Sequence, residues 1–554
     1  SDTLVTATFN NYKLRQMRSL ENNRSRAMAY VNSFIVGTSW KSEVGRIDRL
    51  SKVTKDDIVA WAKKWIGENN YAIVYKHIGV DGSIKKIEAP KITPIVTNRD
   101  KQSVFLTEIQ NSSPKEIEPM FIDFSKDMSE ISSKGLDVLY KHNSNNDIAT
   151  LVYRFDTGLM QDPALTFALD YVSYLGTPSL TAEQISSLMY TYACRFGLNT
   201  SNSTTNITIS GLDENLDKAM TLVDDLLSHA VGDEEILANL KAQTLKDRAD
   251  SKRNQRACYG ALLNYITYGP EFIRRTTLTN EQLMALTSDE LLSKVRSLTL
   301  KKHRVLYYGP ESGTEFISTL SGNHFVPENP EPLALELPVS RQTPRSEVIF
   351  ADYPSRQFYY WQYSDRGEKF DIAESPAIAL FNNYFGGGMN TVVFQEMREA
   401  RALAYSANAY LSTPSHKDDT YSFSAFIASQ NDKLTQAVEA FDQIINDMPK
   451  SDKAFDIAKA GLLSHLRTER HTGIDVLNSY INCEMLGLKE PASRAVFEAV
   501  PGMTLDNLSE TQHKWVKDRT YVYGILGDRS DLDMKFLSSL GPVTVVSGED
   551  IFGY

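Results

Sequence analysis

Cysteine is scarce in this sequence of 554 residues, which contains only Cys194, Cys258 and Cys483. Three cysteines that lie so far apart supply neither a disulfide framework nor a metal-binding cysteine cluster. Long apolar runs are also missing, since no stretch of about 18 apolar residues occurs, and we therefore expect no transmembrane segment. The net charge of -11 leaves no excess of basic groups to neutralise phosphates, which argues against binding to nucleic acid.

The sequence does contain a three-fold internal repeat. Each copy has a Thr-x-x-acid-or-amide helix start, an amphipathic helix and a final apolar strand before a glycine. The helix starts are Thr54–Asp57, Thr287–Glu290 and Thr504–Asn507, the expected strands are Tyr71–Tyr75, Arg304–Tyr308 and Tyr521–Tyr523, and the glycines are Gly79, Gly309 and Gly527. The glycines are 230 and 218 residues apart, a period that fits a duplicated domain rather than a solenoid repeat.

The first copy is expected to begin in its middle. With a period of 230 residues, Ser1 corresponds to about Val231 of the second copy. The first copy therefore holds less than half of a domain, mostly helix plus one strand. A lone strand with apolar helix faces cannot satisfy its backbone or bury its side chains. We therefore expect the rest of this domain to come from elsewhere.

Two proline-bearing stretches divide the chain. Residues 88–119 and 327–344 are expected to be extended linkers. The predicted domains are then a C-terminal domain fragment over 1–87 and two complete domains over 120–326 and 345–554.

Strand patterns in the two complete domains follow the same order. Alternating or apolar runs predict half-buried strands, helical patterns follow them, and further strands and long helices come after. The expected strands are Leu136–Tyr140, Ala149–Phe155 and Ile207–Ser210 in one domain, and Val348–Phe350, Gln357–Trp361 and Thr420–Ser424 in the other. Hairpin-linked strands with helices on one face predict an α+β fold with repeated antiparallel sheets.

The strongest local signature is the Gly-rich stretch Tyr384–Asn390, followed by the segment Val392–Tyr405. This arrangement resembles the non-zinc-binding domain of the pitrilysin/insulinase (inverzincin) family of zinc metallopeptidases. In that family a Gly-rich turn leads into a helix with an arginine, and a tyrosine follows seven residues later on a strand. Arg398 and Tyr405 have that spacing, and the resemblance implies that they are catalytic.

Gly386, Gly387 and Gly388 suit either a tight strand-helix corner or a loop that faces substrate. No lysine follows them in the manner of a phosphate-binding loop. We expect a corner near the peptide path and treat the three glycines as candidate substrate-binding residues.

The resemblance extends over the whole chain and implies repeated domains of the pitrilysin/mitochondrial-processing-peptidase type, with two complete copies after part of a third. It implies a zinc endopeptidase whose metal lies in an N-terminal half or partner subunit. Arg398 and Tyr405 would hold the substrate main chain and stabilise the oxyanion. The alternative is a non-catalytic scaffold or peptide-binding subunit. Related bacterial enzymes are often periplasmic, which suggests the same compartment here.

No zinc is expected in this chain alone. The family binds zinc through H-x-x-E-H on a helix, where two histidines share one face and the glutamate activates water. The corresponding positions of the first complete domain hold Phe167, Asp170 and Tyr171, which cannot replace that motif.

His465, Glu469 and His471 form a rival cluster. His465 and Glu469 are expected on one helical face, but His471 lies about 240° around the helix from His465. A solvated polar face is therefore favoured over a metal site.

Overall fold

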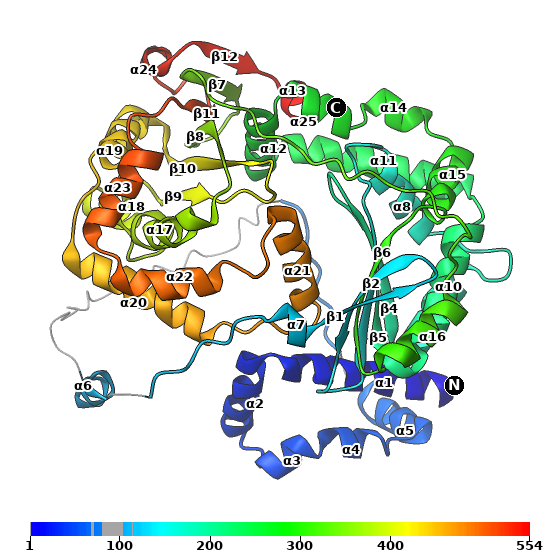
Figure 1. The fold of residues 1–554 in the computed structure, drawn as a ribbon. Helices are drawn as coiled ribbons and strands as arrows, with labels where there is room; N and C mark the ends of the chain where they lie inside the picture. Colours follow the sequence, from blue (N-terminus) through cyan, green and yellow to red (C-terminus); the bar gives the residue numbers. More distant parts are fainter. Residues whose placement is uncertain (1, 68–70, 80–102, 113–114) are drawn as a thin grey trace.

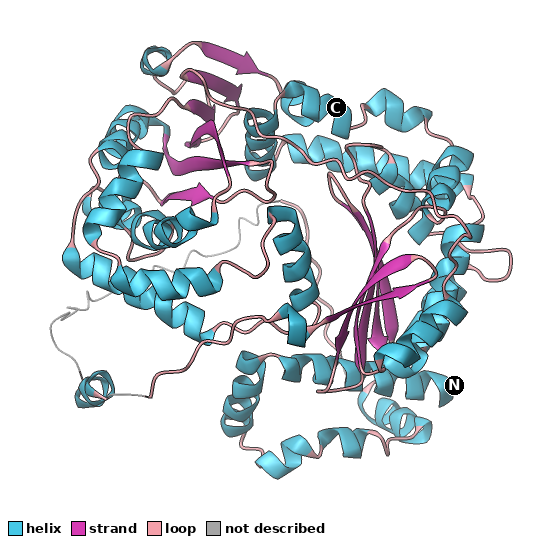
Figure 2. Cartoon of the chain, in the orientation of Figure 1, coloured by secondary structure: helices cyan, strands magenta, loops and turns pink. Residues whose placement is uncertain are grey.

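The computed structural model describes residues 2–67, 71–79, 103–112 and 115–554 (Figure 1). Its two main bodies are mixed α/β units, each built on one six-stranded sheet. Figure 2 shows the helices gathered against the sheets and the long loops that connect the bodies. The expected α+β architecture with repeated sheet-plus-helix units is confirmed.

The first sheet has the strand order β1-β2-β6-β3-β5-β4. Strands β2 and β6 run parallel, and every other neighbouring pair is antiparallel. The strands are β1 (Ser129–Ser133), β2 (Leu136–His142), β3 (Ile148–Phe155), β4 (Cys194–Thr200), β5 (Thr205–Leu212) and β6 (Arg304–Gly309).

The second sheet has the order β12-β7-β11-β8-β10-β9, which repeats the arrangement of β2-β6-β3-β5-β4 but takes its remaining edge strand, β12, from the C-terminal end of the unit. Strand β7 pairs parallel with both β11 and β12, so both sheets are mixed rather than purely antiparallel as expected from the hairpin pattern. A strand that returns after a helical crossover can join its neighbour in parallel. The strands are β7 (Glu347–Asp352), β8 (Gln357–Lys369), β9 (Ser406–Ser412), β10 (Thr420–Gln430), β11 (Val522–Gly527) and β12 (Val543–Val546).

Helices cover one face of each sheet and form its main core. In the first unit they are α8 (Leu165–Ser173), α9 (Ala182–Thr191), α10 (Leu216–His229), α11 (Glu234–Lys252), α14 (Asn280–Ala285), α15 (Ser288–Leu298) and α16 (Gly313–Asn323). In the second they are α17 (Ser375–Phe381), α18 (Val392–Phe394), α19 (Leu434–Asn446), α20 (Asp452–Thr468), α22 (Ser493–Ala499), α23 (Leu505–Trp515) and α24 (Met534–Leu540). The short helices α13 (Pro270–Thr276) and α25 (Gly548–Phe552) pack against each other and against α12 (Gln255–Tyr268) instead.

The opposite face of each sheet is covered by a helix from the other unit. Helix α12 (Gln255–Tyr268) of the first unit packs Leu262 and Ile266 against strands of the second sheet. Helix α21 (Asp475–Leu486) of the second unit packs Leu477 and Ile481 against β2 and β6 of the first sheet. The two units thus exchange equivalent helices.

The first five helices of the chain correspond in order to α11–α15. They are α1 (Asp2–Glu21), α2 (Asn23–Val36), α3 (Trp40–Val44), α4 (Arg46–Leu50) and α5 (Lys55–Trp65). Leu14 of α1 packs on Ile148 and Leu212 of the first sheet, which fixes this segment to the first unit. The three predicted helix starts all form capping boxes, at Thr54, Thr287 and Thr504.

The predicted strand over Tyr71–Tyr75 is wrong for the described structure, because residues 71–77 have no regular secondary structure. Val74 and Tyr75 are exposed. Its counterparts β6 and β11 each lie between two other strands. Without such neighbours, the backbone groups of a single strand have no ladder to join.

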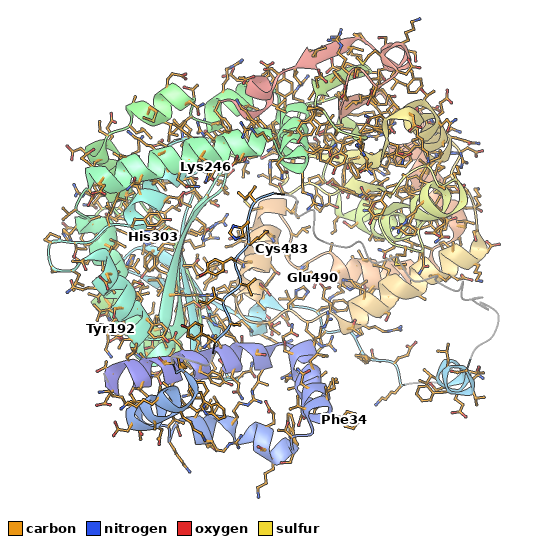
Figure 3. All side chains as sticks on the ribbon, turned by 180° about the vertical axis from the view of Figure 1, so that it is seen from behind. Phe34, Tyr192, Lys246, His303, Cys483 and Glu490 are labelled. Atoms are coloured by element: carbon orange, nitrogen blue, oxygen red, sulfur yellow. The ribbon has the colours of Figure 1, made fainter. Side chains whose placement is uncertain are left out.

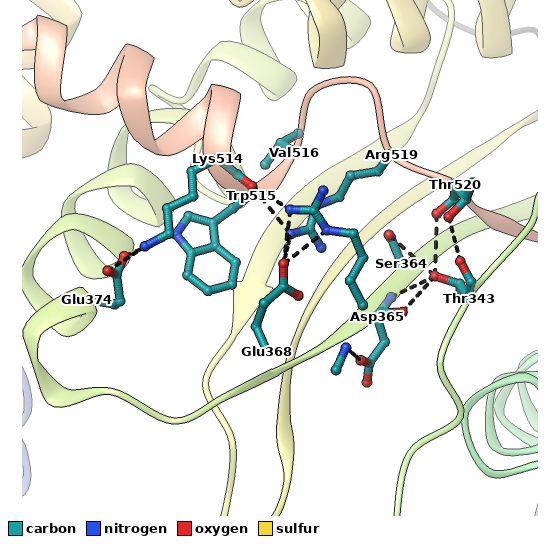
Figure 4. A network of polar contacts seen from close by, with 12 residues as sticks. Thr343, Ser364, Asp365, Glu368, Glu374, Lys514, Trp515, Val516, Arg519 and Thr520 are labelled. Carbon is teal, nitrogen blue, oxygen red and sulfur yellow. Dashed lines mark hydrogen bonds and ion pairs between the residues drawn. The ribbon is translucent and has the colours of Figure 1, made fainter.

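The two predicted linkers differ in structure. Much of 88–119 lies outside the described residues, but the helix α6 (Val104–Asn111) forms within it, contrary to a fully extended linker, and α7 (Phe124–Asp127) follows. Residues 327–344 form no helix or strand. The end of this stretch is pinned where Thr343 exchanges hydrogen bonds with the Asp365 backbone (Figure 4). In the same network the buried Arg519 lies 3.2 Å from the Glu368 carboxylate.

Candidate functional site

The Gly-rich segment connects α17 to the edge strand β9 through two π-helical turns, η3 (Asn382–Gly386) and η4 (Gln395–Ala400), with the short α18 between them. Such turns widen the helix by one residue and recur at functional sites. The expected helix therefore exists, but most of it is π-helical. This path brings the glycines, Arg398 and Tyr405 to one end of the second sheet.

Gly386 is required by packing against β9. A Cβ at this position would lie 2.5 Å from the Ala409 carbonyl oxygen. The neighbouring Asn382 side chain donates to the Leu411 carbonyl at 2.9 Å and accepts from the Leu411 N–H at 2.8 Å. The outer edge of β9 is thereby covered by the turn, and the absence of a side chain at Gly386 allows this close approach.

Gly387 and Gly388 are exposed beside Met389. The Gly388 carbonyl accepts hydrogen bonds from the backbone N–H and the hydroxyl of Thr391, at 3.1 and 2.7 Å. Neither glycine adopts a positive φ. These two glycines form the open part of the turn, with a backbone that an incoming chain could approach.

Arg398 lies on η4 with its side chain 44% exposed. Its guanidinium carbon is 5.0 Å from the Phe394 ring centroid and 5.4 Å from that of Tyr405. The Glu399 carboxylate is 3.8 Å from Nε. The guanidinium is thus held over two rings by cation–π contacts while its N–H groups remain accessible to solvent.

Tyr405 is 75% exposed and stands one residue before β9, rather than on the strand as expected. Its backbone N–H donates to the Ala428 carbonyl at 3.2 Å, so the main chain is already aligned with β10. The preceding turn contains Ala402 at φ 48°, a conformation that non-glycine residues rarely adopt. In the first unit Ala193, which directly precedes β4, also has a positive φ, of 49°.

Arg398 and Tyr405 therefore lie in contact, and they offer two kinds of hydrogen-bond donor, a guanidinium and a phenol. Phe394 and Ala402 were missed by the sequence reasoning. Phe394 precedes Arg398 by four residues, the spacing of neighbours on a helix, and this signal could have revealed it. Alanine carries no signal for a positive φ.

The residues of the first unit do not fit a zinc site. Phe167 and Tyr171 are buried in α8. The Tyr171 hydroxyl accepts from the Asp233 N–H at 2.7 Å and lies 2.9 Å from the Ser288 hydroxyl, so this helix face is committed to packing. In the part of the chain that the structure describes, no three His, Cys, Asp or Glu side chains are grouped as metal ligands.

The rival histidine cluster is also split by the fold. Helix α20 ends at Thr468, so Glu469 lies just beyond the helix and does not continue its face. Glu469 is instead 3.7 Å from Nε2 of His471.

Among the described helices, each is too short or too polar to cross a lipid bilayer.

Comparisons with known proteins bear on the segment that holds the candidate site. The family model described as the peptidase M16 inactive domain matches residues 313–462, which include the three glycines, Arg398 and Tyr405. A Rickettsia felis protein named as an uncharacterized zinc protease is 24% identical over 287 residues. That match covers 50% of this chain and 65% of the relative.

Two solved structures share the fold. A peptidase M16 inactive domain from Pseudomonas fluorescens matches with a TM-score of 0.58 at 17% identity, over 73% of this chain and 99% of that one. The periplasmic protease PqqL from Escherichia coli matches with a TM-score of 0.56 at 13% identity, over 95% of this chain and 62% of that one. The chain thus spans under two thirds of the longer proteins that it matches. Together these findings support the resemblance to a C-terminal portion of a pitrilysin/insulinase (M16) zinc metallopeptidase, with residues 313–462 matching its inactive domain.

Proposed function

We propose that this chain is the non-zinc-binding half of a zinc-dependent endopeptidase, and that Arg398 and Tyr405 hold the substrate main chain and stabilise the oxyanion. The observation that carries this proposal is the contact between the exposed Arg398 guanidinium and the exposed Tyr405 ring. Buried or fully paired side chains would have no donors left for a ligand. This pair keeps its donors in solvent.

The chemistry of each group follows from its donors. The other half would hold the zinc, which would supply Lewis-acid polarisation of the scissile carbonyl and a more acidic bound water. Arg398 can donate two parallel hydrogen bonds to a peptide carbonyl or to a tetrahedral oxyanion, and Tyr405 can donate one. Such donors accelerate the reaction when they bind the transition state more tightly than the substrate. Gly387 and Gly388 leave room for the substrate backbone beside the pair.

The zinc-bearing half is proposed as a partner polypeptide or a preceding part of the same protein. An apolar groove of about 480 Å³ lies between α1 and α5, lined in part by Phe9, Tyr12, Ile58 and Val59. Equivalent helices α15 and α23 bury their apolar faces in complete units. The open groove therefore fits the missing layer of a third unit. Because PqqL is described as periplasmic, we extend that compartment to this protein as a proposal.

The test uses the assembled enzyme with Arg398→Ala, measuring bound zinc and the rate of peptide cleavage. We expect kcat to fall roughly 100-fold or more with zinc content unchanged, the size of effect seen when one oxyanion donor is removed. Arg401→Ala is the matched control, because Arg401 pairs with Glu396 at 3.5 Å and with Gln443 at 3.0 Å.

Two results would separate the candidate functions. A selective loss in Arg398→Ala supports the endopeptidase half. Unchanged cleavage in Arg398→Ala, or equal losses in both variants, would remove the catalytic role and favour the alternative of a scaffold or peptide-binding subunit.

A further inference from the structure

The exchange of helices α12 and α21 between the two units indicates where a third equivalent helix would pack. Helices α12 and α21 occupy equivalent places in the repeat. Each packs on the sheet of the other unit, on the face that the other unit's own helices leave open. Each follows a long helix along the chain, α11 before α12 and α20 before α21. Helix α2 follows α1 in the same way.

Sequence identities confirm that α2 is the third member of this set. Asn22 and Asn254 cap α2 and α12 by accepting a backbone N–H three residues on, at 3.1 and 3.0 Å. An asparagine lies five residues before the closing glycine in all three helices: Asn32 and Gly37, Asn264 and Gly269, and Asn482 and Gly487. The three glycines all have positive φ, at 73°, 86° and 72°.

The face of α2 that corresponds to the covering face of α12 is apolar and uncovered. It consists of Ala27, Tyr30, Val31 and Phe34, which have the spacing of one helical stripe. Tyr30 is 58%, Val31 44% and Phe34 87% exposed. Their counterparts in α12 include Leu262 and Ile266, which are buried against the second sheet. Figure 3 shows Phe34 standing out from the N-terminal helices.

Neither sheet of this chain can accept α2. The open face of the first sheet is taken by α21 and that of the second by α12. A second copy of the chain would have both faces taken in the same way. The occupant of the stripe must therefore bring a sheet of its own.

We infer that the α2 stripe, Ala27, Tyr30, Val31 and Phe34, docks on the open face of the sheet of the zinc-bearing unit. This inference rests on the proposed function, because it takes that unit to be another sheet-plus-helix body of the same type. The stripe fits this partner because both helices equivalent to α2 cover such a face. Burial of a large apolar side chain in that position stabilises the assembly.

The test measures association between the chain and the proposed zinc-bearing unit, expressed as a separate polypeptide and loaded with zinc. We expect Phe34→Lys to weaken binding at least tenfold. Because the Phe34 side chain is exposed, its replacement should leave the unfolding temperature of the free chain unchanged. Val36→Lys is the control, since Val36 is 75% exposed but lies about 200° around α2 from Phe34.

Hydrogen exchange supplies a readout that does not depend on a variant. The α2 amides should exchange more slowly in the assembly than in the free chain. Equal exchange in both, or equal binding by Phe34→Lys and wild type, would overturn the inference while leaving an active assembly in place. If the zinc-bearing polypeptide fails to bind the wild-type chain at all, the proposed function fails with it. A wild-type homodimer that Phe34→Lys dissociates would identify a second copy as the occupant and also overturn the inference.

Discussion

The Arg398 guanidinium carbon lies 5.4 Å from the centroid of the Tyr405 ring, with Arg398 on η4 and Tyr405 in the loop just before β9. Phe394 approaches the same guanidinium from η4, at 5.0 Å. Contact with two rings limits the rotamers of a long side chain and so reduces the entropy lost when it binds a ligand. In the proposed mechanism Tyr405 is therefore both a hydrogen-bond donor and a support for Arg398.

The two roles of Tyr405 can be separated by two substitutions. In the assembled enzyme, Tyr405→Phe removes the hydroxyl and keeps the ring, and we expect a roughly 100-fold lower kcat. Tyr405→Leu also removes the ring beneath Arg398, which should cost about fivefold more because an exposed cation–π contact contributes roughly 1 kcal/mol. Cleavage kinetics with measured zinc content check both values. Wild-type kcat in Tyr405→Phe would show that the hydroxyl does not reach the substrate.

Gly386 should be intolerant of even one methyl group. A Cβ at Gly386 would lie 2.5 Å from the Ala409 carbonyl oxygen, so Gly386→Ala forces the turn away from β9 and should destabilise the chain by about 1–3 kcal/mol. Gly461→Ala is the comparison, because nothing lies within 4 Å of its Cβ position on α20. That variant should gain about 0.5–1 kcal/mol from helix propensity. Denaturant unfolding measures both, and equal stability of the two variants would contradict the packing role.

His303 makes stability depend on pH. Its Nε2 lies 2.9 Å from Nε2 of His324, whose Nδ1 lies 2.8 Å from the Asp224 carboxylate, and Tyr153 stacks on His324 within the same buried layer. Figure 3 shows His303 inside the first unit. Burial and the neighbouring His324 lower the pKa of His303 from 6.5 to about 4.

The unfolded chain then binds a proton at His303 below about pH 6.5, but the folded chain does so only near pH 4. Stability should fall by up to about 3 kcal/mol as the pH decreases through this window. His303→Gln removes that part of the dependence, and the exposed His513→Gln does not. Parallel pH curves for wild type and His303→Gln would refute the assignment.

Asp442 has the opposite pH dependence. Burial raises the pKa of its carboxyl from 3.8 to about 6, although Gln362 donates to it at 3.2 Å. The folded state therefore holds a proton that the unfolded state releases near pH 4, and stability is lost as the pH rises from about 4 to 6. Asp442→Asn should stabilise the chain by up to about 3 kcal/mol at pH 7.5 and little at pH 4. The exposed Asp432→Asn is the control. An Asp442→Asn variant that is less stable than wild type at pH 7.5 would disprove the claim that the ionised Asp442 carboxylate destabilises the fold.

The sequence was sufficient for features that local chemistry decides. The alternating runs at Ala149–Phe155 and Thr420–Ser424 form β3 and part of β10, because side chains must face one core. The capping boxes at Thr54 and Thr287 also depend only on near neighbours. Tyr71–Tyr75 has an equally apolar pattern, but a strand needs partners that its own sequence cannot supply.

Long-range relationships were beyond the sequence pattern. The apolar stripe of α12 predicts burial, but not that Leu262 would be buried on the sheet of the other unit. The spacing between Arg398 and Tyr405 was sufficient to select the pair, whereas the π-helical turns and Ala402, which set their contact, have no sequence signal. The domain boundaries and the roles of Arg398, Tyr405, Gly386, Gly387 and Gly388 stay predictions.

The most direct test of the central claim is to measure zinc content and peptide cleavage for residues 1–554 alone and for the same chain assembled with its zinc-bearing half. We predict that the chain alone binds no stoichiometric zinc and does not cleave peptide, because Phe167, Asp170 and Tyr171 offer no zinc site, and that the assembly does both. Stoichiometric zinc with cleavage by residues 1–554 alone would contradict the account.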